Sequence, residues 1–335
     1  MIPVFVSHPQ TMLDMYFGQR ALQALRTIAD VRLNPTPHDL PEAELVAAAR
    51  DCEVLIAFRQ TPAPATLFAA LPQLAAFVRC AMDIRTVDVA AASAHGVLVT
   101  RASSGFNTAV AEWIVAMMIN LGRGLTDHAA AYRRGGVPAP QMGRELRDAV
   151  VGIIGYGGIG RCVGDLALAF GARLLVTTPQ PVATHDRLTQ VPLGALLANA
   201  DFVVCLAPAL PETAQLMNAE AFAAMKPGAY FVNASRGELV DEDALLAALH
   251  GGRLAGCAID VGLAPDQTPS GALARHPRVI ATPHIGGLTL PAIEHQALET
   301  VQQVSSLLHG QVPVGAVNAE HATRWQRLGA TRRVN

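Results

Sequence analysis

The stretch Val150-Val151-Gly152-Ile153-Ile154-Gly155-Tyr156-Gly157-Gly158-Ile159-Gly160 decides the fold, because an apolar run leads directly into Gly-x-Gly-x-x-Gly. A strand, a glycine turn and a helix place backbone N–H groups at a helix N-terminus, where they can hold a dinucleotide pyrophosphate. The first glycine permits the tight turn, the second lets the backbone approach the phosphates, and the third lets helix and strand pack closely. Residues 155–160 are therefore candidate cofactor-binding residues.

The chain that follows this turn has the pattern that a dinucleotide site requires. Apolar residues recur at helical spacing from Ile159 to Phe170, Gly171 ends that helix, and Leu174-Leu175-Val176 forms a second apolar strand. The alternative is a glycine-rich turn without a ligand. Both flanks favour dinucleotide binding.

Composition limits the classes of partner. The 335 residues suggest about two domains, 51% of them are hydrophobic, and the net charge of −2 provides no basic surface for nucleic acid or an anionic membrane. The five cysteines form no Cys-x-x-Cys pair, Glu294-His295 lacks a second histidine, and we expect no metal. The start of the chain lacks a basic leader, which favours a cytoplasmic protein with a small-molecule partner.

The first hundred residues alternate short apolar strands with helical patterns, which predicts a parallel sheet covered by helices. The expected helices include Met12–Ile28 and Glu42–Arg50. The expected strands are Ile2–Val6, Val31–Leu33, Val54–Phe58, Ala75–Val78 and Val97–Val99. This pattern is typical of a small doubly wound α/β domain.

A second α/β run extends from Val150 to about Pro283, after an apolar helix from Thr108 to Leu121 for which Asn107 is the predicted N-cap. Six strands are expected near 151–154, 174–177, 202–206, 229–233, 255–260 and 279–281, with a capped helix over Asp241–His250. The helix Pro291–His309 has no sheet of its own, so we expect it to return to the first domain. The polar tail from Ala319 is predicted to pack poorly.

Three strand ends carry residue types that suit hydride chemistry on a hydroxy acid. Arg236 follows the strand that ends at Asn233, and a guanidinium can grip a carboxylate bidentately. Asp260 ends an apolar strand, where it could bind a carboxamide. His284 lies between Pro283 and a glycine-containing turn, and imidazole suits proton exchange near neutral pH.

In this order, the motifs resemble the D-2-hydroxyacid dehydrogenase family. The resemblance includes the region from Arg79 to Asp88, Val110-Ala111-Glu112, the glycine turn, Pro208 to Thr213, Asn233 to Gly237 with Asp241-Glu242, Asp260-Val261, Pro277 to Gly287 and Val317-Asn318. It implies two doubly wound parallel-sheet domains: a Rossmann nucleotide-binding domain over 102–286, inserted in a flavodoxin-like substrate domain formed by 1–101 and 287–335.

The resemblance also implies the roles of the site residues. Arg236 would hold the 2-oxo acid carboxylate together with loops at Arg59, Met82 and Asp83, in a cleft between the domains. His284 would protonate the carbonyl oxygen, or act as the base in oxidation. Beyond residues 155–160, the implied NAD(P)-binding residues are Thr178, Ala207, Pro208, Thr213, Asn233, Ala234, Ser235, Asp260, His284 and Gly286.

One departure from the family affects catalysis. The family usually has a glutamate that hydrogen-bonds the catalytic histidine and raises its pKa, and Pro265 occupies that position here. Asp266 is adjacent and could reach His284, although its side chain is shorter and Pro265 restricts the backbone. Without a carboxylate partner the pKa of His284 would be lower, which weakens it as an acid.

Two further departures concern the ligands. An acidic residue is expected at the end of the second strand, to bind the adenosine ribose, and Thr178 stands there. Its loss removes repulsion of a 2′-phosphate and favours NADP(H), with Arg187 as the nearest downstream cation. In the substrate loop Ala81-Met82-Asp83-Ile84-Arg85 the acid has moved and a cation has entered, so the substrate could differ from lactate, glycerate or phosphoglycerate.

The leading hypothesis is therefore an NAD(P)-dependent 2-hydroxyacid dehydrogenase or 2-oxoacid reductase. The alternative from another class is a catalytically weak or inactive dinucleotide-sensing protein of the same fold. A relative of formate dehydrogenase is disfavoured, because Pro265 does not supply the glutamine common at that position. The apolar surface of the helix from Thr108 favours a homodimer over a central buried helix by a narrow margin.

Overall fold

The computed structural model describes residues 1–330 and divides the chain into two compact units. Unit 1 comprises Met1–Phe106 and the chain from Thr289 onward, and unit 2 comprises Asn107–Leu288. The sequence predicts domain changes after residues 101 and 286, and the structure has them after 106 and 288. The second unit is thus an insertion in the first.

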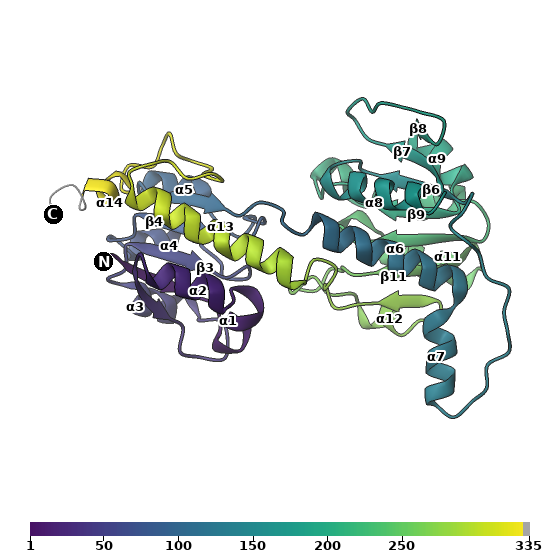
Figure 1. The fold of residues 1–335 in the computed structure, drawn as a ribbon, viewed down its shortest axis with the longest axis horizontal. Coiled ribbons are helices and arrows are strands. Elements are labelled where there is room, and N and C mark those ends of the chain that lie inside the picture. The colour runs from purple at the N-terminus through teal and green to yellow at the C-terminus, as the bar shows by residue number, and fades with distance from the viewer. Residues whose placement is uncertain (331–335) are drawn as a thin grey trace. The chain divides into compact units, whose positions relative to one another are not determined.

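Unit 1 contains a five-stranded parallel sheet in the order β2-β1-β3-β4-β5 (Figure 1). Its strands are β1 (Pro3–Val6), β2 (Asp30–Leu33), β3 (Val54–Ala57), β4 (Ala76–Arg79) and β5 (Leu98–Arg101). The order reverses between β1 and β3, which is the flavodoxin-like arrangement. Because the carboxyl ends of parallel strands meet at one edge, this edge gathers the loops that follow β1, β3 and β4.

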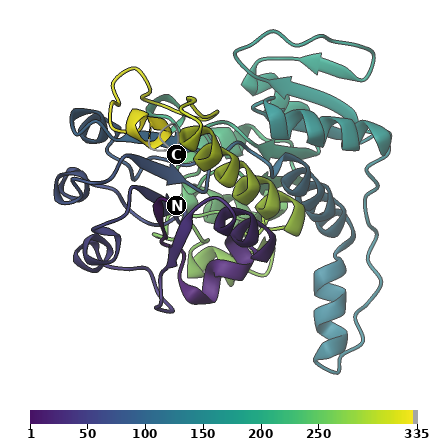
Figure 2. The ribbon, with the colours of Figure 1, turned by 60° about the vertical axis from the view of Figure 1, so that its left-hand side comes forward.

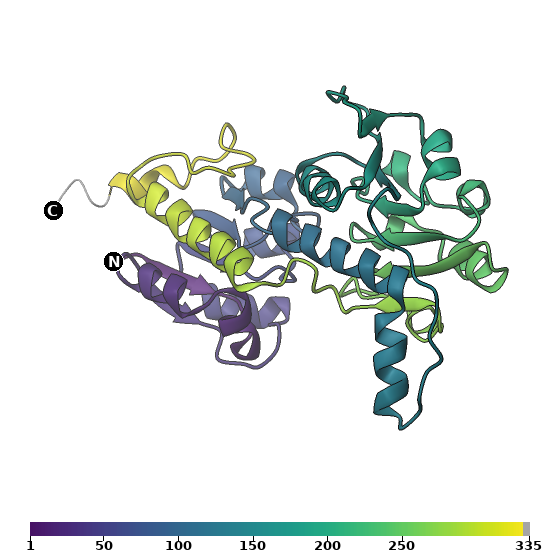
Figure 3. The same ribbon diagram turned by 45° about the vertical axis from the view of Figure 1, so that its right-hand side comes forward.

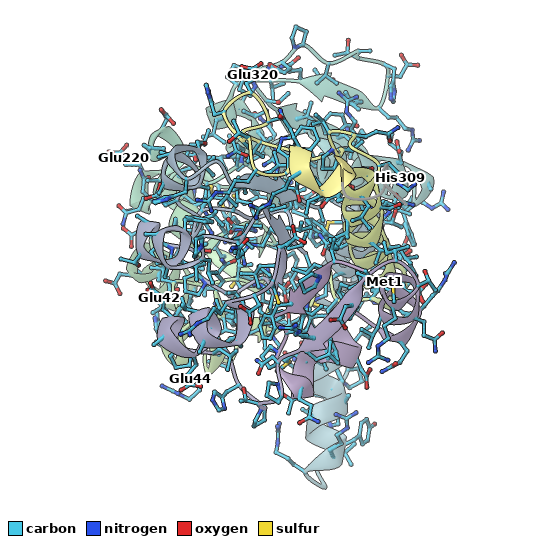
Figure 4. All side chains as sticks on the ribbon, turned by 90° about the vertical axis from the view of Figure 1, so that its left-hand side faces the viewer. Met1, Glu42, Glu44, Glu220, His309 and Glu320 are labelled. Carbon is cyan, nitrogen blue, oxygen red and sulfur yellow. The ribbon has the colours of Figure 1, made fainter. Side chains whose placement is uncertain are left out.

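The sheet of unit 1 is buried on both faces. The helices of unit 1 are α1 (Gln10–Tyr16), α2 (Gln19–Arg26), α3 (Glu42–Ala49), α4 (Ala65–Ala70), α5 (Val89–Ala94), α13 (Leu290–Leu308) and α14 (Gln326–Ala330). Along β1, Val4 and Val6 face a core shared with α2 and α13, whereas Phe5 faces the opposite core, shared with α3, α4 and α5. In Figure 4 the labelled side chains of Glu42 and Glu44 project outward from the first turn of α3.

Two predictions for unit 1 are wrong. The single helix expected over 12–28 is two helices, because the chain breaks at Phe17 and Gly18, and Gly18 has φ of 79°. The tail is not poorly packed up to residue 328, since Trp325 and Leu328 are buried in the core beneath α13. Together with Ala322, these apolar side chains dock the tail, and the polar composition around them hides that signal.

The predicted return of the last helix to the first domain is confirmed. Helix α13 packs along α2 and α1, as Figure 2 shows, and buries Ala297, Val301 and Val304 in the core of unit 1. The helix is amphipathic, so its apolar stripe completes a sheet face that the first hundred residues leave uncovered.

Unit 2 contains a seven-stranded parallel sheet in the order β12-β11-β10-β9-β6-β7-β8. Its strands are β6 (Val150–Ile154), β7 (Arg173–Thr177), β8 (Leu188–Gln190), β9 (Phe202–Cys205), β10 (Ala229–Asn233), β11 (Leu254–Ile259) and β12 (Val279–Ala281). The order reverses between β6 and β9, which is the Rossmann arrangement with one added strand. The sequence does not predict β8, because three residues of mixed polarity carry no clear alternation.

Helices cover both faces of the sheet in unit 2. They are α6 (Asn107–Arg123), α7 (Leu125–Arg133), α8 (Gly158–Ala169), α9 (Leu193–Asn199), α10 (Ala219–Ala224), α11 (Glu242–His250) and α12 (Gly271–Ala274), with short 3₁₀ turns at Pro211–Thr213 and Gly237–Leu239. Helix α7 and the chain after it stand off from the sheet, as Figure 3 shows. No helix within residues 1–330 has the length and apolarity needed to span a membrane.

Candidate dinucleotide and active site

The glycine turn after β6 has the geometry that its spacing predicts. Gly155 has φ of 93°, and a Cβ there would lie 2.7 Å from the backbone of Leu206 and Ala207, which follow β9. A Cβ on Gly160 would lie 2.5 Å from the carbonyl oxygen of Gly155. Both positions therefore require glycine, and the turn lies at the point where the strand order reverses.

Gly157 differs from these two, because a Cβ there would meet nothing within 4 Å. It is the N-cap residue of α8, and no side chain caps the backbone N–H groups of that helix. An open backbone beside uncapped N–H groups is the arrangement that a pyrophosphate requires. The turn therefore fits a bound dinucleotide. The Tyr156 side chain is buried and abuts α8 at Gly164, which leaves only its backbone for a ligand.

The loop after β9 lies beside this turn. The hydroxyl of Ser235 donates a hydrogen bond to the carbonyl of Ala207 at 2.6 Å, which ties this loop to the one after β10. Within the loop, the hydroxyl of Thr213 bonds the carbonyl of Pro208 at 2.6 Å. The structure thus brings Ala207 and Ser235 together at the same edge as the glycine turn, and Thr213 shapes the loop at Pro208.

Thr178 lies at the end of β7 and is half-buried. Gln190 donates from Nε2 to the carbonyls of Thr178 and Gln180, at 2.9 and 3.0 Å, and so fixes the path of the loop. Arg187 does not lie near Thr178, because its guanidinium bonds the carbonyl of Gly171, which precedes the other end of β7. The suggestion that Arg187 could receive a 2′-phosphate is therefore wrong.

The turn after β10 presents Arg236. Buried Asn233 accepts a hydrogen bond from the backbone of Ser235 at 3.1 Å and donates to the carbonyl of Arg236 at 3.0 Å. The half-buried Arg236 also donates to the carbonyl of Ser235 at 2.7 Å. Asn233 therefore sets the backbone of the arginine turn, with Ala234 within it.

Asp260 organises the loop that carries His284. Its carboxylate accepts hydrogen bonds from the hydroxyl of Thr282 at 2.5 Å and from the backbone N–H groups of Ile285 at 2.8 Å and Gly286 at 2.7 Å. Gly286 has no room for a side chain, since a Cβ there would lie 2.9 Å from the same carboxylate. Asp260 is 3% exposed, so these charge-assisted bonds satisfy a buried charge and hold both sides of the loop.

His284 has φ of 56°, a left-handed conformation that residues other than glycine rarely adopt. The bonds from Asp260 to Thr282 and Ile285, on either side of it, over-determine this backbone. Strained residues held in this way cluster at functional sites. Because β10, β11 and β12 are neighbours, Arg236, Asp260 and His284 follow adjacent strand ends at one edge of the sheet.

Asp266 lies within electrostatic range of His284. Thr268 donates to its carboxylate from the hydroxyl at 2.8 Å and from the backbone at 3.2 Å. These bonds lower the pKa of Asp266, and the charge of protonated His284 lowers it slightly further. Pro265 and Asp266 are both exposed, and the next residue, Gln267, has φ of 62°. The loop therefore holds an ionised carboxylate within electrostatic range of the histidine.

The expected substrate residues of unit 1 lie at the carboxyl edge of its sheet. Arg59 follows β3 and stacks over the ring of Tyr16, with 5.9 Å between the guanidinium carbon and the ring centroid. Asp83 follows β4 and forms an ion pair with Arg85 at 2.9 Å, while Met82 is exposed. The acid and the new cation of this loop thus bind one another.

Arg79 falls within the region that resembles the family, but no role is predicted from the sequence for Arg79 or for His8, which lie at the ends of β4 and β1. Both are fully buried at the same edge of unit 1. The signal was available, since a charged residue that ends an apolar strand is the pattern that identified Asp260. Within residues 1–330, no group of three or more histidine, cysteine or acidic side chains could hold a metal ion.

Residues 115–286 match the family described as "D-isomer specific 2-hydroxyacid dehydrogenase, NAD binding domain". The chain is 32% identical to the D-3-phosphoglycerate dehydrogenase of Synechocystis sp. over 304 residues, which cover 90% of this chain and 54% of that protein. This chain thus spans about half the length of the curated relatives that it matches.

Solved structures have the same fold over nearly the whole chain. The TT0316 protein from Thermus thermophilus is 30% identical, with a TM-score of 0.85 over 94% of this chain and 100% of that chain. The D-lactate dehydrogenase from Escherichia coli is 25% identical, with a TM-score of 0.83 over 95% of this chain and 100% of that chain. The likeness therefore extends over both units.

Proposed function

Since the chain belongs to the D-isomer-specific 2-hydroxyacid dehydrogenase family, we propose that it interconverts a small 2-hydroxy acid and its 2-oxo acid with a nicotinamide dinucleotide. The observation that carries the proposal is the Asp260 carboxylate, which holds the His284 loop beside the Arg236 turn. Both residues follow strands of the sheet that carries the open glycine turn. A proton donor, an anion-binding group and a dinucleotide site thus share one edge of unit 2.

In this proposal Arg236 binds the substrate carboxylate. Its guanidinium offers parallel N–H donors that match a carboxylate, and Asn233 fixes the backbone from which it projects. The positive charge beside the reacting carbonyl also stabilises the developing alkoxide. Arg59, Met82 and Asp83, with the backbone around them, are the proposed substrate contacts from unit 1. The backbone N–H of Arg85 already donates to the Asp83 carboxylate at 2.9 Å, so the proposed backbone contacts are other N–H groups of that loop.

His284 is the proposed general acid in reduction and the general base in oxidation. The strained loop directs its imidazole from a fixed backbone, which favours proton transfer because the reacting atoms need little reorganisation. Asp266 is the proposed positioning carboxylate for this ring, in place of the family's glutamate. Its negative charge favours the protonated imidazole, and hydrogen bonds from Thr268 keep the carboxylate ionised.

The proposed cofactor site consists of the glycine turn, the loop after β9 and the residues at the ends of β10 and β11. A bound nicotinamide dinucleotide would supply or accept the hydride. Gly157 and the N-terminus of α8 would hold its pyrophosphate, and the loop that begins at Thr178 would meet its adenosine ribose. Because Thr178 carries no charge, we expect NADPH to be accepted as well as NADH.

A screen of 2-oxo acids with both NADH and NADPH tests this function. Glyoxylate, hydroxypyruvate and pyruvate are the first substrates to try, and absorbance at the nicotinamide band is the measurement. We expect turnover with at least one acid, a loss of about a thousandfold or more in His284→Ala, and a comparable loss in Arg236→Gln. His321→Ala, which alters an exposed histidine of unit 1, should have wild-type activity.

The same experiment separates the enzyme from a dinucleotide sensor. Cofactor binding measured by fluorescence, without turnover of any acid in a broad panel, would exclude the dehydrogenase and favour the sensor. Pro265 is the observation that keeps the sensor in consideration, because it removes the family's usual carboxylate. A protein that binds neither cofactor would exclude both functions.

We also propose that the protein is a homodimer. Helix α7 contains no buried residue, although a helix of nine residues is marginal in water without packing. The ribbon of α7 extends away from the sheet of unit 2 (Figures 1–3), and in this proposal a second copy of the chain covers the helix.

A further inference from the structure

Arg79 is a buried cation that the proposed mechanism does not use. It ends β4, its side chain is 0% exposed, and no carboxylate within residues 1–330 pairs with it. Burial lowers its pKa to about 10, so the guanidinium remains charged at neutral pH. A buried charge without an ionic partner is costly, and such a residue persists only where the charge or its hydrogen bonds serve a purpose.

The guanidinium of Arg79 connects the two loops that carry the proposed substrate contacts of unit 1. It donates to the carbonyls of Phe58 and Thr61, which bracket Arg59 and Gln60. The same Nη2 atom that bonds Thr61 at 2.7 Å also donates to the hydroxyl of Thr86 at 3.1 Å, in the loop after β4. One rigid side chain therefore sets the spacing between the two loops.

Neighbouring groups strengthen this arrangement without neutralising it. Ser7 accepts a hydrogen bond from the backbone of Phe58 at 2.9 Å, and its hydroxyl bonds that of Thr61 at 2.8 Å. His8 is packed between Phe17 and Phe58, and neither ring nitrogen has a partner among the described residues. Burial lowers the pKa of His8 to about 3, so at neutral pH His8 is uncharged and Arg79 supplies the positive charge beneath loop 58–61, with Asp83 as the nearby acid that raises its pKa.

We propose that Arg79 is a positioning residue for the substrate carboxylate. It holds loops 58–61 and 81–87 at the spacing at which their backbone N–H groups grip the anion, and its buried charge adds attraction from below. The inference rests on the proposed function, because the anion is the carboxylate of the 2-oxo acid. It predicts that altering Arg79 weakens substrate capture while cofactor binding in unit 2 is unchanged.

The test compares Arg79→Lys and Arg79→Met with Arg101→Lys as the matched control. Arg101 is the register partner of Arg79 on β5, but it is exposed. Lysine keeps the positive charge but lacks the planar guanidinium that donates to three acceptors. We therefore expect KM for the 2-oxo acid to rise about tenfold, while kcat changes less than about threefold. The dissociation constant for NADH should stay constant. Arg79→Met should raise KM further, because it also removes the charge.

Amide hydrogen exchange provides a second readout that does not depend on turnover. In both variants, we expect faster exchange in peptides that cover 59–61 and 82–86, and no change in peptides from unit 2. Lower thermal stability with unchanged KM and unchanged exchange in these loops would overturn the proposal and leave Arg79 a purely structural residue. If the wild type reduces no 2-oxo acid, the proposed function fails. Unchanged loop exchange in the variants would then overturn the positioning role independently.

Discussion

At the scale of single residues, Asp266 is the proposed carboxylate partner of His284, because Pro265 occupies the position of the family's glutamate. We predict that Asp266→Asn lowers kcat/KM for reduction at pH 8 by about two- to fivefold and has a smaller effect at pH 6, because solvent screens this exposed charge. A carboxylate stabilises the protonated imidazole, so its loss lowers the pKa of the proton donor and shifts the alkaline limb of the profile to lower pH. The pH profile of kcat/KM is the measurement.

Asparagine keeps an oxygen that can accept from Thr268, so the loop should retain its conformation. Asp186→Asn, in an exposed loop of unit 2, is the control and should reproduce the wild-type profile. A profile for Asp266→Asn that overlays the wild type would show that His284 works without this carboxylate.

The buried His8 should make the free energy of unfolding depend on pH. Burial, aided by the charge of Arg79, lowers the pKa of His8 to about 3, whereas the unfolded chain protonates this group near its ordinary value of 6.5. The unfolded state therefore binds the extra proton between pH 6.5 and 3, and stability falls as the pH falls through this window. At pH 5 the expected loss from this group is about 2 kcal/mol relative to pH 8.

His8→Leu should remove that loss, because leucine has a similar volume and no titrating group. The measurement is the urea midpoint of the wild type and the variant at pH 8 and pH 5, with His321→Leu as the exposed control. Equal losses in wild type and His8→Leu between the two pH values would contradict a neutral, desolvated His8.

At the scale of elements, substitutions in the glycine turn before helix α8 should separate effects on thermal stability from effects on cofactor binding. Gly157→Val should leave the melting temperature within about 2 °C of the wild type, because a Cβ there meets no protein atom within 4 Å, but should weaken NADH binding about tenfold or more. Gly160→Ala should instead destabilise the fold, since its Cβ would overlap the carbonyl of Gly155. Calorimetric titration and thermal unfolding measure the two effects.

Gly194→Ala on α9 is the matched control, because its Cβ also meets nothing within 4 Å and it lies away from the turn. It should raise the melting temperature slightly, as alanine favours a helix. Weakened cofactor binding in Gly194→Ala, or unchanged binding in Gly157→Val, would contradict the position given to the pyrophosphate.

The elements that sequence predicts well are those whose signal is local. Buried parallel strands such as β3 and β4 appear as short apolar runs, and Asp241 caps α11 as its position predicts, accepting from the backbone of Ala244 at 3.1 Å. The break between α1 and α2 and the docking of Trp325 depend on contacts between distant segments, which periodicity does not contain. The fold class and the family residues at strand ends could therefore be predicted.

Much of the candidate site depends on long-range hydrogen bonds that no local pattern specifies. The hydrogen bonds between Asp260 and Gly286 and between Arg79 and Thr61 join segments that are remote in sequence. Arg187 shows the opposite error, because closeness in sequence to Thr178 suggested a closeness in space that the strand pair β7–β8 prevents. Residue types at strand ends predict which groups are present, and the folded chain decides which of them meet.

At the scale of the whole molecule, the proposed homodimer explains a segment that a monomer leaves uncovered. Helix α7 and the chain that follows it expose Leu125, Tyr132, Val137 and Met142, with exposed fractions of 52%, 62%, 85% and 101%. Four apolar side chains within one short segment form the kind of surface that a subunit interface buries. Closed twofold assembly is also the commonest arrangement of soluble oligomers.

We therefore predict a dimer at micromolar concentration and a monomer in the double variant Tyr132→Asp/Met142→Asp, because two charges in an apolar interface without partners each oppose association. Light scattering coupled to gel filtration measures the mass, and Val314→Asp, at an exposed apolar residue of unit 1, is the control that should remain dimeric. Since the glycine turn lies elsewhere in unit 2, the monomeric variant should bind NADH with the affinity of the wild type. A monomeric wild type, or a double variant that remains a dimer, would remove α7 and its following chain as the interface.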